Sequence, residues 1–229
     1  MGIFQQSANK RYDQGTEFRL IRDYISANTL KRIKSIKSFD ELEQEFSFYV
    51  IPKASDRTAE LRFGQRHMRQ PGINDEPALE QGGILVYSMG PDSKTGVFLY
   101  SCVSPLTAWH VDGLALRLGE QSYLQFQDRF DADLQNLLLY CRVTSCGAKA
   151  SLFDKARVTW LEWTCPTVKN GKVSAPKWQF WVGEAMGAAT KGGISGVAKA
   201  LVPIVILALL AAVGLSHCSA SQWFSKPGM

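Results

Sequence analysis

Residues 83–100, GILVYSMGPDSKTGVFLY, carry the clearest fold signal in the chain. Two apolar runs, residues 83–87 and 97–100, flank a stretch rich in turn-forming residues, 90–96. Aliphatic β-branched and aromatic residues favour strands, whereas Gly, Pro, Asp and Ser favour turns. The stretch therefore predicts an antiparallel β-hairpin.

The chain ahead of this hairpin begins with helical patterns. Residues 16–36 place apolar side chains at helical spacing, so we expect a helix there with a break near Asn28. The sequence Ser38-Phe39-Asp40-Glu41 has the form of a capping box. It predicts a short second helix over residues 39–46.

The pattern then changes to strand and loop. Residues 46–51 are apolar and β-prone, and they predict a strand that Pro52 ends. Residues 54–82 are polar and contain Gly and Pro, which predicts a long loop. Basic side chains gather in this stretch: Arg57, Arg62, Arg66, His67 and Arg69. Both an anion-binding loop and a solvated surface loop fit them.

The remainder of the domain combines strands with one more helix. We expect strands at residues 108–118 and 121–127 and a helix at 131–140. Two alternating stretches, 157–163 and 177–182, predict a final strand pair joined across Asn170-Gly171. The fold class is therefore α+β, with N-terminal helices followed by a mainly antiparallel sheet.

Composition agrees with a folded domain in a reducing compartment. The chain has 229 residues, 45% hydrophobic and 21% charged, which argues against a disordered chain. Its cysteines have neither disulfide-scaffold density nor metal spacing: Cys102, Cys141, Cys146, Cys165 and Cys218. We expect neither a metal nor a cofactor.

A hydrophobic segment without charge lies near the C-terminus. It consists of Ala200, Leu201, Val202, Pro203, Ile204, Val205, Ile206, Leu207, Ala208, Leu209, Leu210, Ala211, Ala212, Val213, Gly214 and Leu215. Extended to residues 194–216, it is long enough for a transmembrane helix, which needs about 20 residues. The sequence predicts a single C-terminal membrane anchor.

Lysines set the orientation of this anchor. Lys169, Lys172, Lys177, Lys191 and Lys199 precede the segment, and only Lys226 follows it. The positive-inside rule then places the preceding domain in the cytosol, facing the inner membrane if the host is bacterial. We expect a cytosolic domain over residues 1–182, a Gly/Ala-rich juxtamembrane segment over 183–199, the anchor, and a short external tail over 217–229.

Small residues recur before the anchor. Gly192, Gly196 and Ala200 form a small-xxx-small series, which lets helices approach closely in a membrane. A flexible linker fits the same glycines, so a helix-packing face, a homo-oligomer contact and a plain linker stay open.

One group of residues has the chemical types of a catalytic site. His110 and Asp112 are two residues apart on an expected strand, so both lie on one face of it. Cys102 could supply a nucleophile. No nucleophile elbow or second motif accompanies them, and a packed or surface histidine fits this pattern better. We therefore expect no catalytic residues, and keep an enzyme or ligand sensor with a pocket near His110 and Cys102 as an alternative.

A basic helix face supplies the best candidate contact surface. Lys31, Arg32, Lys34 and Lys37 fit a lipid surface or an acidic protein partner better than nucleic acid in a membrane-tethered domain. The sequence thus favours a non-enzymatic interaction protein that binds, blocks or regulates another membrane protein at the bilayer. A membrane-permeabilising effector acting through residues 183–215 is a further alternative.

This build is similar to that of membrane-attached exclusion and immunity proteins of plasmids and phages, and entry-exclusion proteins of conjugative plasmids are the first example to test. The similarity is one of architecture, a small cytosolic domain on one anchor. No motif supports it, so it assigns no residue a role.

Overall fold

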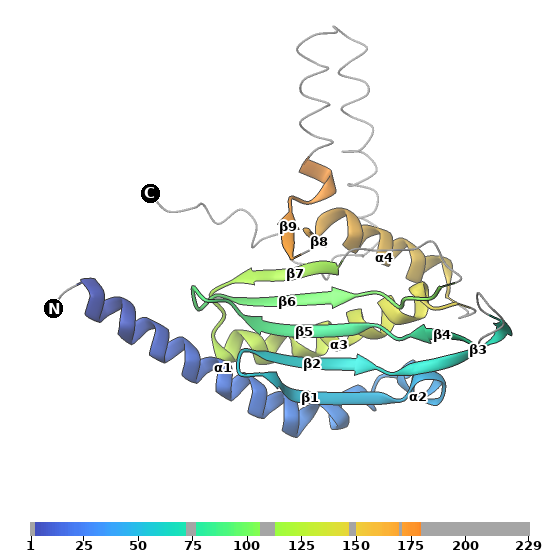
Figure 1. Ribbon diagram of the computed structural model, residues 1–229, viewed down its shortest axis with the longest axis horizontal. Coiled ribbons are helices and arrows are strands. Elements are labelled where there is room, and N and C mark those ends of the chain that lie inside the picture. Colours follow the sequence, from blue (N-terminus) through green and yellow to red (C-terminus); the bar gives the residue numbers. More distant parts are fainter. Residues whose placement is uncertain (1–2, 72–76, 106–112, 147–149, 170, 180–229) are drawn as a thin grey trace, which may run out of the picture. The chain divides into compact units, whose positions relative to one another are not determined.

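The computed structural model describes residues 3–71, 77–105, 113–146, 150–169 and 171–179 (Figure 1). The chain divides into two units, and the first, Met1–Ala175, holds nearly all of the described residues. All elements below belong to this first unit.

The described residues of the first unit contain four helices. They are α1 (Ile3–Ile33), α2 (Phe39–Phe46), α3 (Tyr123–Thr144) and α4 (Leu152–Thr164). Helices α1, α2 and α4 all contact α3, which makes α3 the centre of the helical layer.

Antiparallel strands form the second layer. They are β1 (Phe48–Ser55), β2 (Thr58–Phe63), β3 (Gln65–Pro71), β4 (Pro77–Gln81), β5 (Ile84–Met89), β6 (Thr95–Tyr100), β7 (Gly113–Gly119), β8 (Thr167–Lys169) and β9 (Lys172–Ser174). Seven strands form one sheet in the order β1-β2-β5-β6-β7-β8-β9, and β3 pairs with β4 in a small separate sheet.

The core lies between the helices and one face of the large sheet. Alternate residues of β2 and β5 are buried there, among them Leu61, Leu85 and Tyr87. Rings from α1 and α3 pack edge-on into the same core, with the Tyr24 and Phe126 centroids 5.7 Å apart. Because inward and outward side chains alternate along a strand, this burial fixes the register of the sheet.

The α+β class and several predicted elements are confirmed. The 83–100 stretch forms the β5–β6 hairpin, in which Ile84 pairs with Tyr100 and Met89 with Thr95. The predicted second helix is α2, and the 131–140 helix is part of α3. The predicted strand at 108–118 corresponds in its described part to β7.

The long loop predicted over residues 54–82 is wrong. This stretch contains β2, β3 and β4 and the end of β1. Ala59, Leu61 and Phe63 alternate with more polar residues, which is the pattern of a strand buried on one face. Strand β1 continues beyond Pro52 because it is an edge strand, where a missing N–H removes no sheet hydrogen bond.

Two predicted strands are helical. Residues 121–127 mostly belong to α3, which starts with a capping box between Ser122 and Gln125. Residues 157–163 belong to α4, which has a capping box between Ser151 and Asp154. In both helices the cap satisfies backbone N–H groups that would otherwise lack acceptors.

The last predicted hairpin has its turn in the right place and its strands in the wrong ones. Gly171, at φ +73°, lies between β8 and β9, which are only three residues each. Residues 177–179 are not in a strand, and 180–182 lie outside the described residues. Because each of its strands has only three residues, this hairpin includes neither of the two aromatic stretches from which it was predicted.

Two finer predictions about the N-terminal helices are also wrong. Helix α1 runs without a break through Asn28, whose side-chain amide donates to the carbonyl of Tyr24 at 3.1 Å. Ser38 makes no side-chain capping hydrogen bond, so α2 forms without the predicted capping box. Burial of Phe39, Leu42 and Phe46 on one helical stripe accounts for α2.

The predicted anchor, residues 200–215, lies outside the described residues, as do the juxtamembrane segment and the tail. Within the part of the chain that the structure describes, no helix combines the length and apolarity needed to cross a bilayer.

Candidate functional site

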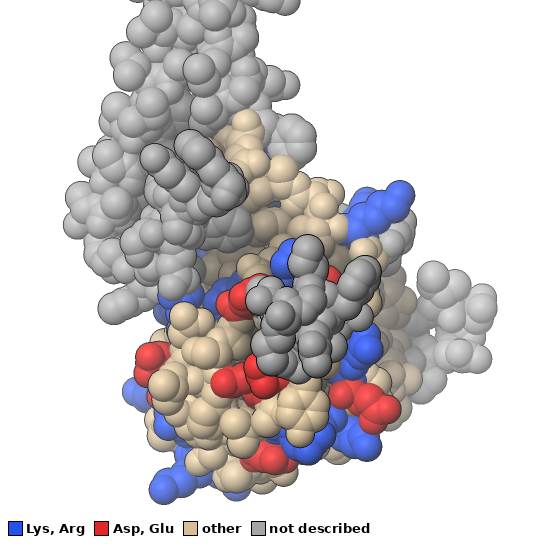
Figure 2. Space-filling model, turned by 90° about the vertical axis from the view of Figure 1, so that its left-hand side faces the viewer, with Lys and Arg blue, Asp and Glu red and all other residues tan. Residues whose placement is uncertain are grey.

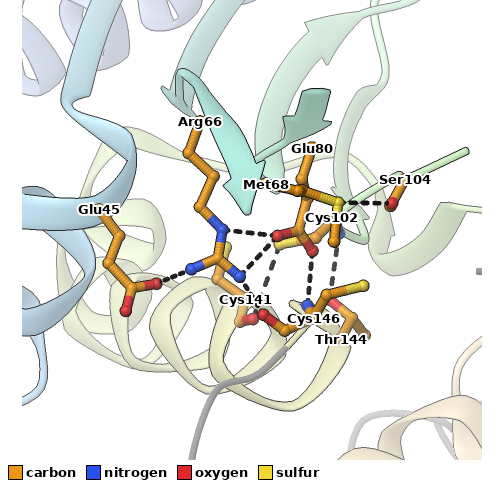
Figure 3. Close-up of polar contacts among 9 residues, drawn as sticks. All are labelled: Glu45, Arg66, Met68, Glu80, Cys102, Ser104, Cys141, Thr144 and Cys146. Carbon is orange, nitrogen blue, oxygen red and sulfur yellow. Dashed lines mark hydrogen bonds and ion pairs between the residues drawn. The ribbon is translucent and has the colours of Figure 1, made fainter. Parts of the chain in front are cut away.

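A buried ion pair between Arg66 and Glu80 forms the centre of a polar cluster (Figure 3). The two residues lie directly opposite each other on β3 and β4. The Arg66 Nε donates to Oε2 of Glu80 at 2.7 Å, and the Glu80 side chain is 1% exposed. A carboxylate this buried requires several polar partners.

Further partners come from distant parts of the chain. The backbone N–H of Cys146 donates to Oε1 of Glu80 at 2.6 Å, and the Arg66 guanidinium donates to the Cys146 carbonyl. Arg66 also pairs with Glu45 on α2 and lies over the Phe46 ring, 4.6 Å from its centroid. Because both Glu80 oxygens accept hydrogen bonds, this cluster joins β3, β4, α2 and the end of α3.

Two buried thiols lie beside this cluster. The Sγ of Cys102 is 3.6 Å from the carbonyl oxygen of Cys141, and the Cys102 N–H donates to Oγ1 of Thr144 at 3.0 Å. The hydrogen bond with Cys141 lowers the pKa of Cys102, whereas burial raises the pKa of Cys141. A Cβ on Gly83 would lie 2.5 Å from the Cys141 Sγ, so only glycine fits there.

This environment limits what Cys102 can do as a nucleophile. Cys102 is 2% exposed, and an attacking thiolate must reach its substrate. His110 and Asp112, the other members of the candidate group, lie outside the described residues. The described residues therefore contain a buried thiol pair, and they do not bring a base to it.

A second buried ion pair, absent from the sequence prediction, lies within the core. Arg117 on β7 forms two hydrogen bonds to Asp133 on α3, one of them 2.8 Å long, and the Tyr87 hydroxyl donates to the same carboxylate at 3.1 Å. Burial raises the pKa of Asp133 against the opposing effect of Arg117. The signal for this pair was an aspartate, Asp133, at helical spacing with the apolar residues Phe126, Phe130 and Leu137.

The predicted basic face is partly engaged within the domain. Lys31, Lys34 and Lys37 are exposed, whereas Arg32 pairs with Asp131 on α3 at 2.6 Å. An open hollow of about 340 Å³ adjoins this pair and is lined by Arg32, Ser35, Ile36, Asp131 and Gln135. On the side of the molecule shown in Figure 2, acidic and basic side chains are interspersed.

The predicted anion-binding group is not assembled. Arg66 is bound to two carboxylates, and Arg62 and His67 are exposed on different strands, β2 and β3. The side chain of Arg69 lies outside the described part. Arg66 thus stabilises the fold through acidic residues of the same chain.

The large sheet has one face that no described helix covers, which is turned to the viewer in Figure 1. Its outward side chains are largely apolar for an open face. Tyr49 is 50% exposed, and Ile84, Val86, Phe98 and Tyr100 are partly exposed. Contiguous apolar patches on a protein surface often mark binding sites.

Comparison with known proteins gives no relative: no family model, curated protein or solved structure matches the chain.

Proposed function

We propose that this chain is a membrane-anchored, non-enzymatic interaction protein whose α+β domain binds or regulates another component of the membrane. The observation that supports this most is the exposed group of Lys31, Lys34 and Lys37, which is suited to an acidic protein partner at a membrane surface. The buried charged groups of the described residues point the same way, because Glu80 and Asp133 are bonded to groups of the domain itself.

The anchor part of the proposal comes from the sequence of residues 200–215. An anchor confines the domain to the membrane surface and raises its local concentration near membrane partners. The exposed Lys31, Lys34 and Lys37 would add attraction to anionic lipid or to an acidic protein. An exclusion or immunity role of the plasmid entry-exclusion type would use this arrangement.

Membrane extraction and site-specific crosslinking in intact cells test the proposal. We expect the full chain to resist alkaline extraction from membranes, and a reporter fused after Met229 to be active outside the cytosol. A photo-crosslinking residue at Lys34 should capture a membrane protein, whereas one at the exposed Lys155 on α4 serves as the matched control.

Two changes to the anchor complete the test. Deletion of residues 200–215 should abolish the Lys34 adduct, and an unrelated apolar helix of equal length should restore it. Release of the full chain by alkali, or an adduct that survives deletion of the anchor, would contradict the proposal.

A further inference from the structure

The open sheet face carries two parallel rows of side chains. Cross-strand pairing places Tyr49, Arg62, Ile84 and Tyr100 in one row. It places Ile51, Glu60, Val86 and Phe98 in the neighbouring row. Within each strand the two rows are two residues apart, so their side chains project from the same face.

Each row contains a single charged residue, and both of these residues lie on strand β2. Arg62 is exposed and Glu60 is half-buried, and both lie on β2 with apolar side chains on the neighbouring strands. Neither charge has an ion-pair partner among the described residues. Glu60 adds to the effect of burial in raising the pKa of Tyr100, so its charge acts across the apolar part of this face.

The two rows are complementary when the face of a second copy is turned onto the face of the first. Consider a two-fold axis that lies between two facing sheets, perpendicular to the strands and midway between the rows. It brings Glu60 of one copy opposite Arg62 of the second copy, and Arg62 opposite Glu60. The same operation brings Ile84 opposite Val86.

The side chains on β1 and β6 are complementary as well. Tyr100 comes opposite Phe98 of the second copy, and Tyr49 comes opposite Ile51. Aromatic and aliphatic pairs of this kind fill a sheet-to-sheet interface, in which two sheets pack about 10 Å apart. A closed two-fold dimer requires such self-complementarity of one surface patch.

We propose that two copies of this chain associate face to face through the open face of the large sheet, with Glu60 of each copy paired to Arg62 of the other. This association goes beyond the proposed function, because its partner is a second copy of this chain and not another component of the membrane. It also assigns a role to two charges that have no ion-pair partner among the described residues.

The size of the face predicts a weak dimer. Strands β1, β2, β5, β6 and β7 are spaced about 4.8 Å apart and contribute roughly 20 Å of length, so the face covers roughly 400–500 Å² per copy. Stable interfaces bury about 800 Å² per partner. Association should therefore be favoured at high local concentration, as on a membrane surface.

Charge reversal and charge exchange test the pairing in the full chain. Two differently tagged copies are co-expressed and crosslinked in intact membranes before solubilisation, and the fraction captured by purification through one tag is measured. We expect wild-type copies to copurify, and Glu60→Arg or Arg62→Glu, when present in both copies, to reduce copurification about tenfold or more because like charges then face each other.

The decisive arm mixes the two variants. A Glu60→Arg copy and an Arg62→Glu copy present complementary charges to each other, so their co-expression should restore copurification. The double variant Glu60→Arg/Arg62→Glu should also self-associate. Asp23→Arg, an exposed site on α1, is the matched control and should leave copurification unchanged.

The proposal is overturned if wild-type copies fail to copurify, or if they do so and the single reversals have no effect. It is also overturned if each single variant dissociates but mixing them does not restore association, because the face then binds something other than a second copy. These outcomes are independent of alkaline extraction and of the Lys34 adduct.

Discussion

The two buried ion pairs of this domain have the same composition but different surroundings. In both, an arginine on a strand binds a nearly inaccessible carboxylate, Glu80 in one and Asp133 in the other. Glu80 also accepts a backbone N–H, from Cys146, which is 66 residues away in the chain. Asp133 accepts a side-chain hydroxyl, from Tyr87.

This difference indicates what each pair contributes. The Glu80 cluster fixes the small β3–β4 sheet against α2 and the end of α3 with hydrogen bonds of defined geometry. Asp133 lies in an apolar core, where burial outweighs the effect of Arg117 and raises its pKa. The first pair is therefore expected to be rigid, whereas Asp133 in the second can respond by taking up a proton.

Replacing Glu80 tests the first half of this comparison and should have the largest effect. Glu80→Ala leaves the largely buried Arg66 cation with only the more exposed Glu45, and leaves the Cys146 N–H without its acceptor. Removing one partner of a buried pair costs about 3–5 kcal/mol. Urea unfolding of the full-length chain in mild detergent measures the loss.

Glu80→Gln is the matched control for this variant. It keeps an acceptor for the Cys146 N–H and removes only the charge, so we expect a smaller loss than for Glu80→Ala. A loss below about 1 kcal/mol for Glu80→Ala would mean that the cluster does not fix the β3–β4 sheet in place, because a surface ion pair contributes that much to stability.

Replacing Arg117 tests the second half and should have a smaller, pH-dependent effect. Arg117→Met removes the group that opposes the raised pKa of Asp133, so the pKa should rise further. The folded state then holds a proton that the unfolded chain releases near pH 4. Since the folded state binds more protons in this window, its stability falls as pH rises from about 4 through the raised pKa.

We therefore expect Arg117→Met to be close to wild type at pH 5 and less stable by about 2–3 kcal/mol at pH 8, within the range for leaving a buried charge unpaired. Unfolding midpoints across this pH range provide the measurement. In the double variant Arg117→Met/Asp133→Asn, which cannot titrate at position 133, the extra pH dependence should disappear. Equal loss at both pH values would show that Asp133 does not change its protonation state between pH 5 and pH 8.

The sequence was informative wherever hydrophobic period and turn residues agreed. The β5–β6 hairpin followed from such agreement, whereas α2 was predicted from a capping box that does not form. It misled at residues 157–163, where alternating apolar and polar letters suggested a strand. Burial of Val158, Leu161 and Cys165 has helical spacing instead, and the Ser151–Asp154 capping box was the deciding local signal.

The polar clusters were harder to predict because their partners are far apart in the chain. Arg66 was interpreted as part of an anion-binding loop, since nothing local indicates that Glu80 lies opposite it on a strand. Arg117 and Asp133 were not singled out, although each interrupts an otherwise apolar pattern. Pairing of buried charges depends on tertiary contacts, which propensity and period do not encode.

The smallest effect is expected from the second carboxylate bound to Arg66. Glu45 is 45% exposed, whereas Glu80 is 1% exposed, although both pair with the same guanidinium. An ion pair with a half-exposed carboxylate is worth about 1 kcal/mol or less, because water solvates the carboxylate when the pair breaks and Arg66 keeps Glu80 as its partner. Glu45→Gln should therefore cost less than 1 kcal/mol in urea unfolding and lose most of this effect in 1 M salt, which screens exposed charges. If Glu45→Gln were as costly as Glu80→Ala, Arg66 would depend on both acids equally, and burial of Glu80 would not be what distinguishes this cluster from a surface pair.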